Sequence, residues 1–262
     1  MATPILLEIA IATVEDALAA QAGGADRLEL NAALALGGLT PSLATLIEIK
    51  RTVSLPILAM IRPRPGGFCY SDADFRVVRR DIDLSLAHGV DGLVFGVLTE
   101  DGCVDGPRCR ELIRQAGDKP VVFHRAFDVT PDPFVALEQL IDLGVRRILT
   151  SGQETSAYNG AAMIAELIHR ASGRIEILPA AGINRFTVAD VVARTGCTQV
   201  HASLRSRRRD GSTAARPHIS FGAAAAHGEE HFDATDADAI RRVRELLTSG
   251  LSVEAGSPSR RR

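Results

Sequence analysis

The feature that most constrains the fold is an alternation of short apolar runs with longer segments of helical periodicity, repeated eight times along the 262-residue chain. The apolar runs predict strands at Ile5–Ala10, Arg27–Asn31, Ile57–Arg62, Gly92–Val97, Val121–Arg125, Arg147–Ser151, Glu176–Ala180 and Thr198–Ser203. The remaining periodic segments predict helices at Thr13–Ala22, Ser42–Thr52, Ser71–His88, Pro107–Ala116, Pro133–Leu143, Ala157–Ala171, Asn184–Arg194 and Thr235–Thr248. Strands that alternate with helices form parallel sheets, and eight unbroken units predict a parallel (β/α)8 TIM barrel.

The barrel is expected to form a single domain over residues 1–250, followed by a disordered basic tail over 251–262. One segment departs from the repeat: Leu204–Asp233 is a long polar connection between the eighth strand and the last helix. A connection of this length in a compact domain is either functional or disordered.

Composition excludes several classes of partner. The net charge is −2, which favours neither nucleic acid nor an anionic membrane surface as a partner, and no apolar run is long enough to span a membrane. The N-terminus shows no secretion signal, so a cytoplasmic location is expected. The four cysteines, Cys69, Cys103, Cys109 and Cys197, have no CxxC spacing and are expected to be free thiols.

Strand alternation places a group of polar side chains inside the predicted barrel. Successive residues of a strand point to opposite faces, so the large apolar alternates are expected to face the helices. The inward set is then Glu8, Glu29, Asn31, Arg62 and His124. These side chains are expected to converge at the C-terminal mouth, where TIM-barrel sites lie.

Two interpretations of this ring remain open. Buried carboxylates are costly unless they are paired, and Arg62 and His124 can pair with Glu8 and Glu29, so the ring could be a structural ion network. Alternatively it forms a pocket for a ligand or a metal, in which Glu8, Glu29, Arg62 and His124 are the candidate catalytic residues. A carboxylate or His124 would then act as acid or base, and Arg62 would hold an anionic group.

A second set of residues follows the last three strands. Gly182, Ser203 and Arg205 lie where many barrels bind phosphate through backbone N–H groups and a helix N-terminus, although small residues there also allow close packing. Ser151 lies in a tight polar turn, where it would contact a ligand or cap the next helix. We therefore treat Asn31, Ser151, Gly182, Ser203 and Arg205 as candidate ligand-binding residues.

Several motifs together resemble the CutC family of copper homeostasis proteins. They are Leu28–Leu34, Gly37-Gly-Leu-Thr-Pro-Ser42, Met60-Ile-Arg-Pro-Arg64, Phe68-Cys-Tyr-Ser71, Asp91-Gly-Leu-Val-Phe-Gly-Val-Leu-Thr99, Phe123-His-Arg-Ala-Phe-Asp128 and Ile148-Leu-Thr-Ser-Gly-Gln153. The resemblance covers nearly the whole chain. It implies a (β/α) barrel, a cytoplasmic location, copper-ion binding with a role in copper tolerance, and a homodimer.

The chain departs from the family pattern at two positions. The resemblance implies cysteines that hold Cu(I) at the ends of the first and second strands, where this sequence has Ala10 and Asn31. Cu(I) prefers sulfur ligands, whereas the carboxylates, amide and imidazole left at the mouth suit a harder cation or a polar organic ligand. The sequence thus leaves the metal open.

Two further functions remain as alternatives to copper binding. One is a TIM-barrel enzyme, namely a lyase, isomerase or hydrolase that acts on a small polar or phosphorylated substrate at the strand ends. The other is a protein that binds a macromolecular partner through the arginine-rich segment that begins at Arg205.

Overall fold

The computed structural model describes residues 4–221 and 229–249. Its barrel strands are β1 (Leu6–Ile11), β2 (Arg27–Leu30), β3 (Ile57–Met60), β4 (Gly92–Phe95), β5 (Val121–Phe123), β6 (Arg147–Thr150), β7 (Glu176–Pro179) and β8 (Gln199–Ala202). Its helices are α1 (Val14–Gly23), α2 (Leu43–Thr52), α3 (Asp72–Ala87), α4 (Gly106–Ala116), α5 (Pro133–Asp142), α6 (Ala161–Ala171), α7 (Val188–Thr195) and α8 (Ala237–Thr248).

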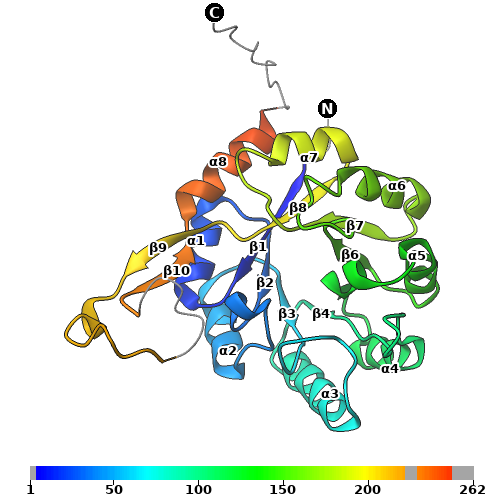
Figure 1. The fold of residues 1–262 in the computed structure, drawn as a ribbon, viewed down its shortest axis with the longest axis horizontal. Helices are drawn as coiled ribbons and strands as arrows, with labels where there is room; N and C mark the ends of the chain where they lie inside the picture. The colour runs from blue at the N-terminus through cyan, green and yellow to red at the C-terminus, as the bar shows by residue number, and fades with distance from the viewer. Residues whose placement is uncertain (1–3, 222–228, 250–262) are drawn as a thin grey trace, which may run out of the picture.

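The eight strands form a nearly closed parallel barrel surrounded by the helices (Figure 1). The hydrogen-bonded order is β7-β6-β5-β4-β3-β2-β1-β8, so β1 pairs with both β2 and β8, and the seam of the barrel lies between β7 and β8. The predicted TIM-barrel fold is confirmed.

Two predicted helices begin later than the sequence pattern suggests. The seventh starts at Val188 instead of Asn184, because Asn184 Oδ1 accepts a hydrogen bond from Phe186 N and so stabilises a turn before the helix. The sixth starts at Ala161 instead of Ala157, whose N–H donates to the carbonyl of Ala181 beyond β7. Side-chain and backbone partners outside the helix therefore delay both starts.

Two apolar layers confirm the predicted alternation. The outward residues of the strands, such as Leu7, Leu28 and Phe123, pack with the buried faces of the helices. A separate inner cluster fills part of the barrel with Leu58, Met60, Val94, Val122, Leu149, Leu178 and Ala180. These inner residues come from the β3 to β7 side, so the side of the barrel formed by β1, β2 and β8 is left to polar side chains.

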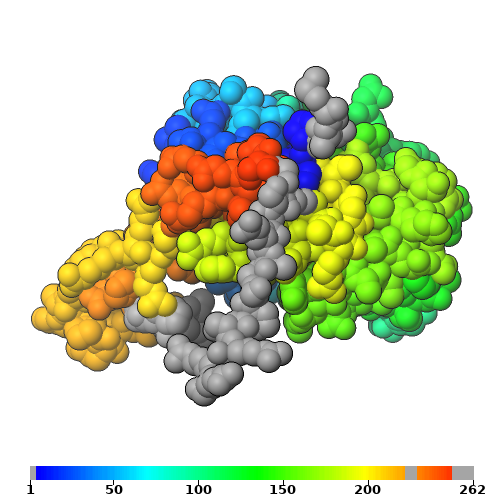
Figure 2. Space-filling model, turned by 90° about the horizontal axis from the view of Figure 1, so that it is seen from above, coloured from blue at the N-terminus to red at the C-terminus, as the bar shows by residue number. Residues whose placement is uncertain are grey.

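The connection after β8 contains a two-stranded ribbon. Strands β9 (Arg205–Arg209) and β10 (His231–Thr235) pair in antiparallel fashion. The ribbon projects from the barrel (Figures 1 and 2), and β10 lies beside α1 (Figure 1). The connection Leu204–Asp233, expected to be either functional or disordered, thus contains paired strands near both of its ends. The predicted tail, residues 251–262, lies outside the described residues.

None of the helices within the described ranges combines the length and the apolar character needed to cross a membrane.

Candidate functional site

A pocket of about 1020 Å³ opens at the C-terminal ends of the barrel strands. Seven of the nine residues singled out from the sequence line it: Glu29, Asn31, Arg62, His124, Gly182, Ser203 and Arg205. The other two do not. Glu8 is fully buried next to the pocket, and Ser151 is buried in a neighbouring turn.

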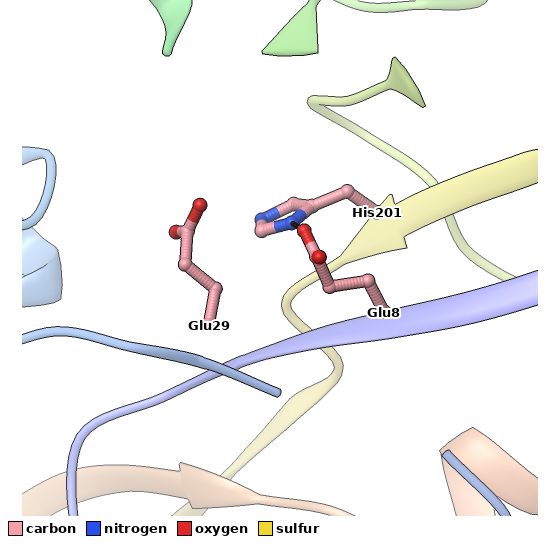
Figure 3. Close-up of side chains that lie close together, drawn as sticks. All are labelled: Glu8, Glu29 and His201. Carbon is pink, nitrogen blue, oxygen red and sulfur yellow. Dashed lines mark hydrogen bonds and ion pairs between the residues drawn. The ribbon is translucent and has the colours of Figure 1, made fainter. Parts of the chain in front are cut away.

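At the polar side of the barrel the imidazole of His201 lies between two carboxylates (Figure 3). The Nδ1 atom of His201 is 2.7 Å from Oε1 of Glu8, which fixes the orientation of the ring. Glu29 lies on the other side, and one ligand atom of each of the three residues lies within 4.8 Å of the other two. Strands β1, β2 and β8, which are neighbours in the sheet, supply one residue each.

The surroundings of this group set its charges. Burial alone would raise the pKa of Glu8, but the hydrogen bond from His201 and the charge of Arg27 outweigh it and lower the pKa to about 2. Burial alone would lower the pKa of His201, but the nearby carboxylates of Glu29 and Glu8 raise it overall. Glu8 is therefore ionised at neutral pH and favours a protonated His201.

Glu29 has the opposite character to Glu8. Burial raises the pKa of Glu29, and the charge of Glu8 adds to this effect, while His201 and Asn31 offset part of it. Asn31 Nδ2 donates to Glu29 Oε1 at 3.0 Å, whereas Glu29 Oε2 has no hydrogen-bond partner among the described residues. Two carboxylates close together thus differ in proton affinity, which is the pattern of an acid–base pair.

A polar network beneath the pocket compensates the buried charge. Arg27 Nε donates to Glu8 Oε2, and Arg27 Nη2 donates to Gln199 Oε1 at 3.1 Å. Gln199 in turn donates to Glu176, which forms an ion pair with Arg147. Both oxygens of Glu8 are therefore engaged, one by Arg27 and the other by His201.

His124 differs from His201 in both charge and role. Burial lowers the pKa of His124 to about 3, and the nearby charge of Arg62 adds to this effect, so the ring is neutral at pH 7. Nδ1 accepts a hydrogen bond of 3.1 Å from Ala126 N, which places the remaining proton on Nε2. That Nε2–H has no acceptor among the described residues, and the ring packs against Phe68. His124 therefore offers a hydrogen-bond donor at the pocket wall.

The guanidinium group of Arg62 donates hydrogen bonds to backbone carbonyls of two loops. Its Nη1 donates to the carbonyls of Leu36 and Gly38, and its Nη2 donates to the carbonyl of Gly66 at 2.7 Å. The side chain therefore joins the loops that follow β2 and β3, and its Nε–H has no acceptor in the described chain. In this arrangement Arg62 shapes the wall of the pocket.

Ser151 belongs to a separate cluster around Asp128. The Oγ atom and the backbone N–H of Ser151 both donate to the carboxylate of Asp128, as does Thr150 Oγ1. Arg125 also donates to Asp128, at 2.8 Å. These bonds hold the turn after β6, which is the role of a turn-stabilising serine.

The residue that sequence reasoning missed is His201. The alternation rule that selected the other inward residues also applies to the eighth strand, where Ser203 and His201 share a face. Applying that rule one step further back from Ser203 would have found it.

Comparison with known proteins agrees with the motifs of the sequence. The profile of the CutC family matches residues 5–206. The chain belongs to the CutC family.

Relatives in this family cover nearly the whole chain. A CutC family protein of Treponema denticola is 46% identical over 93% of this chain and 99% of its own length. The copper homeostasis protein cutC homolog of Mus musculus is 42% identical over 94% of this chain and 90% of its own. A solved structure of CutC from Streptococcus agalactiae is 32% identical, with a TM-score of 0.72 over 75% of this chain and 97% of that one.

Proposed function

We propose that this CutC protein binds a small polar organic molecule at the mouth of the barrel. Glu29 and His201 would take a proton from this molecule and give a proton back to it. The observation that carries the proposal is the position of His201 between Glu8, which orients it, and Glu29, which lines the pocket. Oε2 of Glu29 is buried and has no hydrogen-bond partner among the described residues. Acid–base catalysis uses proton-transferring groups that lie next to a bound substrate and whose pKa values are set by their surroundings.

The residues at this site have different roles. Glu8 holds Nδ1 of His201, which leaves Nε2 as the atom that gives or takes a proton, while Glu29 Oε2 is the complementary site. His124 and Arg62 line the pocket, and their buried Nε2–H and Nε–H groups, which have no acceptor among the described residues, are the candidate donors to oxygen atoms of the bound molecule. Two reaction classes fit this arrangement. An isomerase takes a proton from one atom of the substrate and returns a proton to another, whereas a lyase takes a proton from one atom and gives a proton to the group that leaves when the bond to it breaks.

Copper binding is the second candidate, favoured by the names of the relatives and by the Glu8–Glu29–His201 group. Ala10 and Asn31 at the mouth carry no sulfur, and among the described residues that line the pocket Met60 alone does. Two carboxylates and an imidazole suit a divalent cation better than Cu(I). In addition, both oxygens of Glu8 already have partners, and a cation would displace Arg27 or His201. This donor set does not fit Cu(I).

We place the protein in the cytoplasm as a homodimer, a proposal that rests on the family resemblance. Light scattering of the purified chain tests the assembly. A mass of about twice 27.9 kDa supports the dimer, and a mass of 27.9 kDa contradicts it.

Hydrogen exchange tests the acid–base proposal even while the substrate is unidentified. The protein is incubated in D2O with small hydroxy- and keto-acids and sugar phosphates, and loss of carbon-bound hydrogen is followed by proton NMR. We expect exchange in at least one compound, abolished by Glu29→Gln and retained by Arg207→Gln, a change on the exposed ribbon. Failure of the wild-type protein to exchange hydrogen in any of these compounds contradicts the proposal.

A further inference from the structure

We infer that the molecule bound at the mouth carries a phosphate monoester, held at the rim by Arg205, Arg242 and Arg185. This inference rests on the proposed function and names the class of its substrate. The three arginines lie at the start of β9, on α8 and just before α7, and all three line the same pocket as Glu29 and His201.

The charges that line the pocket favour an anion. Five arginines line it, Arg62, Arg125, Arg185, Arg205 and Arg242, against two carboxylates, Glu29 and Asp128. Asp128 is paired with Arg125, and Arg62 is occupied by carbonyl groups. Arg185, Arg205 and Arg242 form no ion pair with any described residue, so they leave an uncompensated positive rim.

Arg205 provides the more specific observation. Its Nη2 donates to the carbonyl of Asp233, but its Nε and Nη1 are inaccessible to solvent and have no acceptor in the described chain. A guanidinium group stays charged at all physiological pH values, and leaving its N–H groups buried without acceptors is costly. Arg205 therefore has hydrogen-bonding capacity that no described residue uses, and an anionic oxygen in the pocket that it lines would supply an acceptor.

Two short backbone segments form part of this rim. Gly182 follows β7 with a φ of 72°, a conformation that favours glycine, and Ser203 follows β8 with an exposed side chain. These two segments are the ones that bind phosphate in many TIM barrels. Guanidinium groups from three separate segments match a phosphate, whose oxygens accept from several directions, better than a planar carboxylate.

The rim also sets the size of the substrate. Ser203 lies just after β8, two residues beyond His201, which corresponds to about 7 Å of extended chain at about 3.3 Å per residue. A phosphate at the rim would therefore place the third or fourth carbon of its ester near His201 and Glu29. We infer a short phosphorylated compound rather than a nucleotide.

Calorimetric titration with inorganic phosphate tests this inference, with malonate at equal ionic strength as the dicarboxylate comparison. We expect saturable phosphate binding that Arg205→Gln and Arg242→Gln each weaken about tenfold, which corresponds to one charged hydrogen bond. Arg207→Gln, on the same ribbon but outside the pocket lining, should leave it unchanged. Arg242→Gln, on the exposed face of α8, tests the site independently of the ribbon.

Three results would overturn the inference: no saturable phosphate binding, equal binding by Arg242→Gln and Arg207→Gln, or tighter binding of malonate than of phosphate. Hydrogen exchange in D2O separates the two proposals. Exchange without phosphate binding contradicts the phosphate assignment alone, whereas phosphate binding without exchange in any compound contradicts the acid–base function alone.

Discussion

The Nδ1 atom of His201 lies 2.7 Å from Oε1 of Glu8, and the opposite oxygen of Glu8 accepts from Arg27. The carboxylate is thus held between the guanidinium group of Arg27 and the imidazole of His201 in the interior of the barrel. This arrangement explains why a buried carboxylate remains ionised and why it orients the ring of His201 towards the pocket.

Removing Arg27 should destabilise the fold strongly. Arg27→Met leaves Glu8 buried without its arginine partner, and we expect a loss of about 3 kcal/mol of unfolding free energy. Arg51→Met, which removes an exposed pair with Glu48, should cost less than about 1 kcal/mol and serves as the control. Urea denaturation of both variants measures the difference, and equal costs would show that the Glu8 pair contributes no more than a surface pair.

His124 should make stability depend on acidity. Its folded pKa of about 3 lies below the ordinary value of 6.5, so as pH falls below 6.5 the unfolded chain binds a proton that the folded chain does not. The stabilisation present above pH 6.5 is therefore lost as pH falls towards 3. His124→Asn keeps an acceptor for Ala126 N and removes this titration.

We accordingly expect the stability advantage of wild-type over His124→Asn to shrink between pH 6.5 and pH 4, as measured by urea denaturation at each pH. A constant difference across this range would mean that His124 titrates normally in the folded protein.

Copper binding can be measured without reference to catalysis. In anaerobic competition with a Cu(I) chelator, we expect the protein to retain far less than one Cu(I) per chain, because Ala10 and Asn31 provide no sulfur. The variant with Ala10→Cys and Asn31→Cys supplies two thiols at adjacent strand ends and should gain affinity. Stoichiometric retention by the wild-type chain would instead favour the copper function.

Much of this site follows from the period-two alternation of strands. The sequence predicts the barrel and the inward positions of Glu8, Glu29, Asn31, Arg62 and His124, because short apolar strands leave a single consistent choice of face. The sequence does not predict which side chain each of these residues contacts. That Glu8 pairs with Arg27 depends on strand register across β1 and β2, which alternation alone leaves undetermined.

Contacts made by loops are harder still to foresee. Arg62 binds carbonyls of Leu36, Gly38 and Gly66, and these positions depend on the conformations of two loops rather than on any side-chain pattern. The sequence likewise does not predict the β9–β10 ribbon. The run of arginines in β9 has the composition of a loop, and its pairing with β10 joins segments more than twenty residues apart.

The ionisation of His201 is the most direct test of the acid–base unit. Histidine side-chain NMR, with His201 assigned by its absence in His201→Asn, follows the ring through a pH titration. We predict that wild-type His201 remains protonated above pH 6.5 and that Glu29→Gln lowers its pKa, because one of the carboxylates that raise it is removed. A His201 that titrates below pH 6.5, or whose pKa does not change in Glu29→Gln, would contradict the account.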